Sequence, residues 1–141
     1  EDNLRVGGVI HPTSFYAKDR ERVLTLFPRL GERLNSLAGN LSGGEQQMLA
    51  IGRALMTRPK LIMIDELSLG LMPKVIDQCY QALKLLRSEG MTVLLVEQNT
   101  ERALATADDV CVLESGATVW RGSAVDARKD PKLAAAYLGL H

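Results

Sequence analysis

Leu41-Ser42-Gly43-Gly44-Glu45-Gln46-Gln47 is the most informative segment of this sequence. Ser42 is a helix-capping residue, and Glu45 completes the S-x-x-E pattern of a capping box, so we predict a helix over residues 43–56. Two glycines in its first turn cost roughly 1 kcal/mol each relative to alanine, and they make sense where a ligand approaches the backbone. The unpaired N–H groups of a helix N-terminus favour an anion such as a phosphate. On this segment alone, a capped surface helix without a ligand stays open as the alternative.

A short apolar run follows at Leu61–Ile64 and predicts a strand that ends at Asp65. We expect this strand to be buried on both faces, as in a parallel sheet covered by helices. Because ligands of open α/β sheets lie beyond the carboxyl ends of the strands, Asp65 and Glu66 are placed where chemistry is expected. Asp65 would suit Mg²⁺ and Glu66 would suit a water activated for attack, whereas a strand that ends in a solvated turn is the alternative.

A second apolar run, Thr92–Val96, lies after a helical pattern over Lys74–Ser88. A strand, a helix and a strand at this spacing form a βαβ unit, so the two strands are predicted to be parallel with a right-handed crossover. This arrangement brings Glu97-Gln98-Asn99 to the same edge of the sheet as Asp65 and Glu66.

The remaining pattern predicts helices and one hairpin. In chain order we expect a helix that begins near Ala17 and ends at Pro28, a polar connection over residues 29–40, a helix over 100–106, a hairpin over 110–114 and 117–121, a short helix capped by Ser123, and a last helix that opens at Asp130-Pro131. Trp120 is interpreted as hairpin packing rather than as a platform for stacking bases.

Composition narrows the class of protein. The 141 residues are 46% apolar and 24% charged, which is ordinary for a globular domain. Seventeen basic residues balance 17 acidic ones, so no basic field favours nucleic acid or an anionic membrane. Cys79 and Cys111 lie in apolar settings without paired spacing and are interpreted as reduced core residues. No apolar run approaches the length of a membrane span, so a membrane role is expected to come through a partner.

Two of these segments resemble motifs of one family. Leu41 to Gln47 resembles the signature motif of ATP-binding-cassette (ABC) ATPases, and Leu61 to Glu66 resembles their Walker B strand. The similarity runs through essentially the whole chain but covers the second half of such an ATPase domain. The implied fold is α/β, the C-terminal half of a P-loop NTPase domain of ABC type, with a parallel sheet core, a helical subdomain and a C-terminal β-hairpin plus helices. The implied parts are residues 1–57 with the signature motif, 58–99 from Walker B to the switch loop, and 100–141 with the hairpin and helices.

The resemblance also implies site residues for ATP and Mg²⁺. Ser42, Gly43, Gly44 and Glu45 would bind, in trans, the ATP held by the opposite subunit of a dimer.

The Walker B end carries the other implied roles. Asp65 would hold Mg²⁺ through water and Glu66 would be the catalytic carboxylate. Ser68-Leu69-Gly70-Leu71 would form the D-loop at the dimer interface. Gln98 occupies the position of the switch histidine, where it can donate a hydrogen bond but cannot titrate near neutral pH. Leu67 replaces the usual proline of this loop.

A phosphate-binding loop, G-x-x-x-x-G-K-[ST], does not occur in the sequence. Without it the phosphates and the metal lack most of their ligands, so we expect this chain alone to bind ATP and Mg²⁺ weakly and not to hydrolyse ATP. We also expect the shortened sheet to expose an apolar edge, which favours self-association or pairing with the absent half.

The branch of the family and the partners follow from further likeness. Ser68–Pro73, Val96–Asn99, Asp130–Leu133 and Ala136–Gly139 are similar to ATP-binding subunits of branched-chain amino acid importers, whose near relatives import urea or short amides. The resemblance implies a cytoplasmic motor subunit, peripheral on the inner face of the plasma membrane. Its partners would be a second ATP-binding subunit, transmembrane permease subunits and, indirectly, a periplasmic binding protein, with no nucleic acid.

Two other classes stay open as alternatives. A chromosome-maintenance or DNA-repair ATPase would need a long heptad coiled coil before the signature, for which residues 1–40 leave no room. A non-catalytic interaction module would keep the fold without nucleotide handling, and the retention of Asp65 and Glu66 argues against it.

Overall fold

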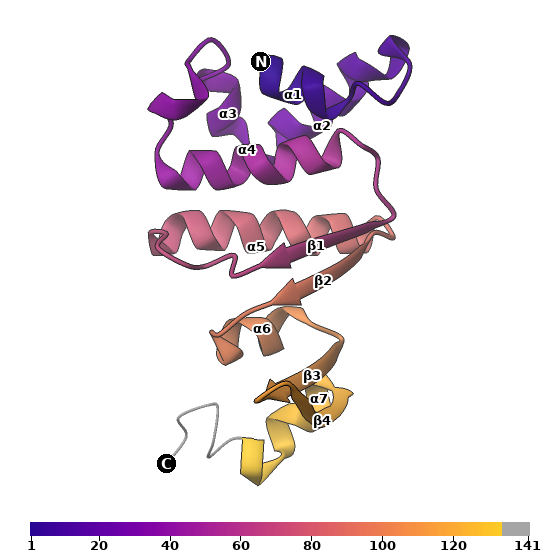
Figure 1. Cartoon of the computed structure of the whole chain (residues 1–141), viewed down its shortest axis with the longest axis vertical. Helices are drawn as coiled ribbons and strands as arrows, with labels where there is room; N and C mark the ends of the chain where they lie inside the picture. The colour runs from indigo at the N-terminus through magenta and orange to yellow at the C-terminus, as the bar shows by residue number, and fades with distance from the viewer. Residues whose placement is uncertain (134–141) are drawn as a thin grey trace. The chain divides into compact units, whose positions relative to one another are not determined.

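A computed structural model describes residues 1–133 of the chain, which divides into two compact units, Glu1–Val96 and Glu97–His141 (Figure 1). The first unit contains α1 (Asp2–Gly7), η1 (Thr13–Phe15), α2 (Tyr16–Leu26), α3 (Pro28–Glu32), η2 (Ala38–Asn40), α4 (Gly43–Leu55), β1 (Leu61–Asp65), α5 (Pro73–Ser88) and β2 (Thr92–Val96). The second contains α6 (Thr100–Thr106), β3 (Asp109–Glu114), β4 (Ala117–Ser123) and α7 (Ala124–Lys129).

Helix α4 begins at the residue that its capping pattern predicts and is fixed at both ends. Its buried face, which includes Met48, Ile51 and Leu55, belongs to the main core of the first unit. Just beyond its C-terminus Arg58 has a φ of 49°, and its Nε donates to both carboxylate oxygens of Asp19 at 3.1 and 2.9 Å. The same guanidinium lies 3.9 Å from the ring centroid of Phe15. These contacts attach the end of α4 to the η1–α2 segment.

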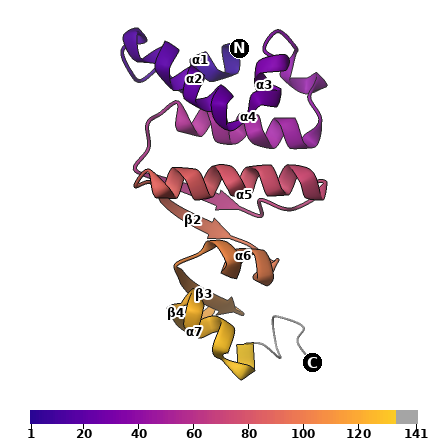
Figure 2. The same cartoon turned by 180° about the vertical axis from the view of Figure 1, so that it is seen from behind.

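The predicted parallel pairing of the βαβ unit is confirmed. Strands β1 and β2 are parallel, in a register that runs from Leu61 opposite Thr92 to Asp65 opposite Val96. Helix α5 forms the crossover, begins with a proline in its first turn and lies beside α4 in both views (Figures 1 and 2). Its apolar side, spaced at helical intervals, packs into the same core as β1.

The expectation that β1 is buried on both faces is wrong. Burial alternates along the strand: Ile62 and Ile64 lie in the core, whereas the opposite face of the sheet carries Leu61, Met63, Leu94 and Val96 at 48%, 70%, 52% and 54% exposure. The packed helices cover only one face, so the period-two alternation of a half-covered sheet appears instead. The described residues add no third strand to this sheet, so the expected apolar edge is present together with an apolar face.

Two smaller expectations need correction. Residues 29–40 are not simply a connection, because Pro28 begins α3 and η2 follows; proline at the first helical position starts a helix as readily as it ends one. Cys111 is exposed rather than buried, since Val110 and Val112 occupy the half-buried face of β3 and the alternating residue points away. Cys79 is buried as expected.

The second unit is built on the predicted hairpin. Strands β3 and β4 are antiparallel and are joined by Ser115 and Gly116, whose φ values of 50° and 79° match a type I′ turn. Trp120 packs against a small cluster of Leu104, Ala124, Ala127 and Leu133, and its Nε1 donates to Asp130 Oδ2 at 3.1 Å. Trp120 therefore has the packing role that its position predicts. Of the family-like tail, Ala136–Gly139 lies outside the described residues.

Candidate functional site

Hydrogen bonds between Ser42 and Glu45 cap the first turn of α4. The Ser42 backbone N–H donates to Glu45 Oε2 at 2.8 Å, and the Glu45 N–H donates to Ser42 Oγ at 3.3 Å. The Ser42 hydroxyl also donates to Glu45 Oε2 at 3.0 Å, which completes the predicted capping box. The Ser42 N–H is the main reason that the pKa of Glu45 is lowered, with the Ser42 hydroxyl, Arg33 and Arg29 acting in the same direction. The loop is therefore preformed around an ionised carboxylate.

The two glycines of this turn have different surroundings. A Cβ on Gly43 would meet only Leu71 Cδ2, at 3.9 Å, so the exposed side of this residue is open to an approaching group. A Cβ on the buried Gly44 would lie 2.6 Å from Val75 Cγ1, which no real pair of carbons tolerates. Packing of α4 against α5 thus accounts for a glycine at position 44, whereas Gly43 is exposed and has open space around its Cβ position. Sequence reasoning gave both glycines the same ligand-binding explanation.

The second predicted group of residues lies where β1 ends. Asp65 is the last residue of the strand and is exposed, and the Glu66 N–H donates to the Val96 carbonyl at 2.9 Å. Glu66 has a φ of 49°, a left-handed conformation that costs a non-glycine residue about 1–2 kcal/mol. Strain of this kind concentrates at functional sites. No residue pattern around Glu66 signals this conformation.

The loop from Glu66 to α5 is anchored by a buried side chain and exposes its tip. Leu67, which stands at the position of the proline in the motif that this loop resembles, is completely buried and packs in the core. Leu69 N–H donates to the Glu66 carbonyl at 3.2 Å, and Leu71 N–H donates to the Ser68 carbonyl at 3.4 Å. Gly70 has a φ of 70°, and Leu69 is 70% exposed. The loop is thus a tight turn that presents an apolar side chain to solvent.

The first unit brings most of these residues to one end. The first turn of α4, the loop after β1 and the first turn of α5 lie at the same end of the unit in both views (Figures 1 and 2). Gln98 belongs to the second unit, two residues after the end of β2, and its role stays a prediction. Within residues 1–133 there is no group of three or more His, Cys, Asp or Glu side chains that could hold a metal. Asp65 fits Mg²⁺ only as one carboxylate that supplements oxygens from phosphates and water.

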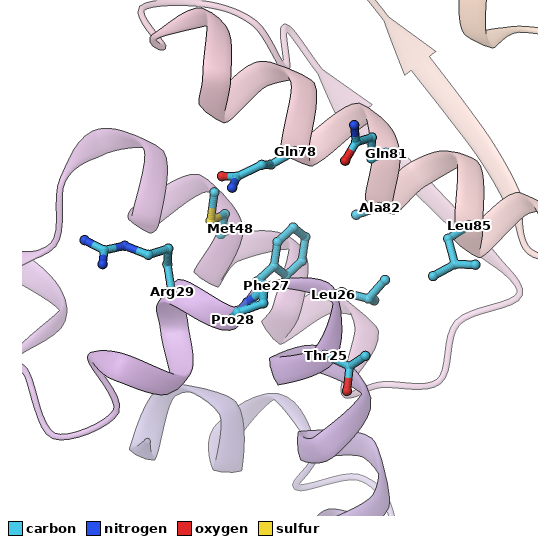
Figure 3. A pocket seen from close by; sticks show the side chains of 10 residues that line it. All are labelled: Thr25, Leu26, Phe27, Pro28, Arg29, Met48, Gln78, Gln81, Ala82 and Leu85. Carbon is cyan, nitrogen blue, oxygen red and sulfur yellow. The ribbon is translucent and has the colours of Figure 1, made fainter.

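A groove of about 280 Å³ lies elsewhere in the first unit, between the α2–α3 corner and α5 (Figure 3). Phe27 and Met48 contribute apolar side chains, and Gln78 and Gln81 contribute polar ones from α5. None of the residues that line this groove is a predicted site residue. No helix of the described chain is long and apolar enough to cross a membrane.

Comparison with known proteins gives the sequence relatives. The ABC transporter family matches residues 6–68. The chain is 50% identical over 139 residues to the high-affinity branched-chain amino acid transport ATP-binding protein BraG of Pseudomonas aeruginosa. This match covers 99% of the chain but 60% of BraG, so the chain spans well under the full length of this relative.

Solved structures give the same fold. The ADP conformation of MJ1267, an ATP-binding cassette of an ABC transporter, matches with a TM-score of 0.74 and 28% identity, over 92% of this chain and 52% of that one. The dimeric, post-hydrolysis state of the ATP-binding cassette MJ0796, bound to ADP and Pi, matches with a TM-score of 0.67 and 28% identity, over 81% and 49% of the two chains. The fold is therefore that of part of an ATP-binding cassette.

Sequence and fold agree on one class: the chain is similar to part of the ATP-binding subunits of ABC transporters, and its relatives include those of branched-chain amino acid importers. Proteins of this family bind ATP and Mg²⁺. Their ATP-binding subunits dimerise and pair with permease components.

Proposed function

We propose that this chain is the signature and Walker B part of an ATP-binding subunit that powers an ABC importer, with branched-chain amino acids as the solute. The observation that carries the proposal is the juxtaposition, at one end of the first unit, of a capped helix N-terminus with an open glycine and a sheet edge that bears two carboxylates. The identity with BraG supports the choice of solute.

In this proposal the two ends of the site have separate tasks. Ser42, Gly43 and Gly44, held by the Glu45 cap, bind the γ-phosphate of an ATP bound to the opposite subunit. Because Gly44 packs against Val75, its contribution is to let α4 lie close to α5 rather than to expose its own surface to the ligand.

The carboxylates serve the ATP that their own subunit binds. Glu66 orients the attacking water, and Asp65 would hold Mg²⁺ through water, an ion that would supply neutralisation of phosphate charge when bound. Gln98 donates a hydrogen bond toward the γ-phosphate. Ser68–Leu71 crosses the dimer interface as the D-loop, for which the exposed Leu69 is suited.

The assembly follows from these roles. The subunit pairs with a second ATP-binding subunit, binds permease subunits on the cytoplasmic face of the plasma membrane and serves a periplasmic binding protein indirectly. Residues 1–57 act as the helical subdomain, 58–99 as the catalytic βαβ unit and 100–141 as the C-terminal part. The dimeric MJ0796 cassette bound to ADP and Pi supports a dimer as the working state.

A hybrid protein tests the proposal. The whole 141-residue chain is joined to the part of BraG that lies outside the matched region, and ATP turnover is measured for the hybrid and for the chain alone. We expect turnover by the hybrid but not by the chain alone. Glu66→Gln should reduce kcat of the hybrid by about 10²-fold or more, because the carboxylate acts in the transition state.

Glu21→Gln, at an exposed glutamate of α2, is the matched control and should leave turnover unchanged. Circular dichroism and gel filtration establish that each hybrid is folded. A folded hybrid with full activity after Glu66→Gln, or turnover by the 141-residue chain that depends on Glu66, would contradict the proposal.

A further inference from the structure

The signature turn and the first turn of α5 meet in one contact between a glycine and a valine. The position of a Cβ on Gly44 is 2.6 Å from Val75 Cγ1, 2.9 Å from Cγ2 and 3.2 Å from Cβ. Gly44 is buried, and Val75 packs against the main core. The valine therefore occupies the space that any other residue at position 44 would need for its side chain.

A second contact joins the adjacent residues. Leu71, the last residue of the proposed D-loop, places its Cδ2 3.9 Å from the Cβ position of Gly43 and packs partly into the core. From Leu71 the chain enters α5, whose first turn is fixed by the Val75 N–H bonded to the Met72 carbonyl at 2.9 Å.

The same loop leads back to the carboxylates. The Leu69 N–H is bonded to the Glu66 carbonyl, the Glu66 N–H is bonded to Val96 at the end of β2, and Leu67 is buried between them. A series of hydrogen bonds and packing contacts thus runs from Glu66, through the proposed D-loop and Val75, to the signature turn of the same chain.

We infer that Val75 is a positioning residue, which sets the place of the signature turn relative to the D-loop and the Walker B acids. The inference rests on the proposed function for its consequence and on the Gly44 contact for its geometry. Close-packed interiors transmit displacement rather than absorb it, so movement of the D-loop is passed to Ser42 and Gly43. Coupling of this kind has to be shown by coupled substitutions, because proximity alone does not establish it.

The chain contains a matched control pair. A Cβ on Gly52, on another face of the same helix, would lie 2.7 Å from Val23 Cγ1. Gly52 and Val23 are both buried, and neither belongs to the proposed site. The same substitutions at this pair report the cost of the packing defect without moving the signature turn.

Hydrogen exchange on the 141-residue chain tests the geometry without ATP. In Val75→Ala we expect about tenfold faster exchange of the Glu45, Gln46 and Leu71 amides, since removing the two methyl groups that pack against Gly44 costs about that factor locally. In Val23→Ala these amides should be unaffected beyond any change in global stability. Equal effects of the two substitutions on these amides would overturn the inference.

A double-mutant cycle in the BraG hybrid tests the consequence. Gly44→Ala should lower kcat by about 10²-fold, the effect of misplacing a reacting group by about 1 Å, with a smaller change in KM. Adding Val75→Ala should restore at least about tenfold of this loss, because it removes the two closest carbons. Gly52→Ala, alone or with Val23→Ala, should change thermal stability and leave kcat within about threefold.

The possible results separate the two proposals. If the parent hybrid is folded but turns over no ATP, the proposed function fails, and hydrogen exchange still decides the positioning role. If Gly44→Ala lowers kcat and Val75→Ala restores none of it, the positioning role fails while the proposed function stands.

Discussion

The signature turn and the β1–β2 sheet differ in how far each is complete within this chain. At the turn, three hydrogen bonds join Ser42 and Glu45, and no residue from Ser42 to Glu45 has a positive φ. At the sheet, one face is bare and Glu66 is held in a left-handed conformation. The signature turn is therefore a local structure, whereas the end of β1 depends on residues beyond its own strand.

The largest expected effect separates the two faces of the sheet. Ile64→Ala should lower the free energy of unfolding of the 141-residue chain by about 2–5 kcal/mol, because it leaves a cavity in the core. Met63→Ala, one residue away on the bare face, should change it by less than about 0.5 kcal/mol. Urea unfolding followed by circular dichroism measures both. Similar losses for the two variants would show that the bare face is covered in solution, for example by a second copy.

The capping box should give the next largest effect. Ser42→Ala should cost about 1 kcal/mol at neutral pH, because the Glu45 N–H loses its acceptor. The pKa of Glu45 is depressed in the folded state, so its contribution is present above the ordinary carboxyl pKa and is lost as the pH falls through the lowered value. The difference between Ser42→Ala and the parent should therefore narrow in acid.

Urea unfolding at several pH values measures this dependence. Ser123→Ala removes a similar cap, at which Ser123 Oγ accepts from the Asp126 N–H at 3.0 Å in the second unit, and should leave the activity of the BraG hybrid unchanged. A loss of activity in Ser123→Ala as large as that in Ser42→Ala would show that capping stability, and not the signature turn, controls turnover.

Glu66 should show a smaller effect of opposite sign. Glu66→Asn should raise the free energy of unfolding by roughly 0.5–1 kcal/mol, since asparagine adopts positive φ more readily than glutamate. The same substitution should abolish turnover in the BraG hybrid. Glu66→Gln, which keeps the shape and the strain, should lose turnover without gaining stability. A stabilised Glu66→Gln would mean that charge, rather than backbone conformation, is the cost at this position.

Thiol labelling detects the two faces without changing stability. Burial raises the pKa of Cys79, on α5 against the packed face, to about 11, so its thiol should resist a disulfide reagent at pH 8. A cysteine introduced by Met63→Cys in a Cys111→Ser background should react rapidly in the folded chain. Rapid reaction of Cys79 would show that the packed face opens in solution.

Sequence reasoning succeeded where structure is local. The S-x-x-E pattern gave the start of α4, the apolar spacing gave α5, and the strand-helix-strand order gave the parallel pairing of β1 and β2. The Ser115-Gly116 turn followed from the Ser-Gly dipeptide, which is a common turn signal between two strands.

The failures came where tertiary contacts act. Nothing in the apolar run Leu61–Ile64 distinguishes a strand covered on both faces from one covered on a single face. The different surroundings of Gly43 and Gly44 depend on Val75, which lies on another helix, and Glu66, with its positive φ, is bonded to Val96 of another strand. Contacts with residues that are distant in sequence cannot be predicted from the local residue pattern.

The attachment of Arg58 to Asp19 and Phe15 has a mechanical consequence for α4. One end of the helix is held against α5 at Gly44, and the other is held through Arg58 to the η1–α2 segment. If the N-terminal end of α4 is displaced while its C-terminal end stays attached, the helix turns as a rigid body instead of bending in the middle. Displacement of the Ser42 end would then rotate α4 about its C-terminal end, where Arg58 contacts Asp19 and Phe15.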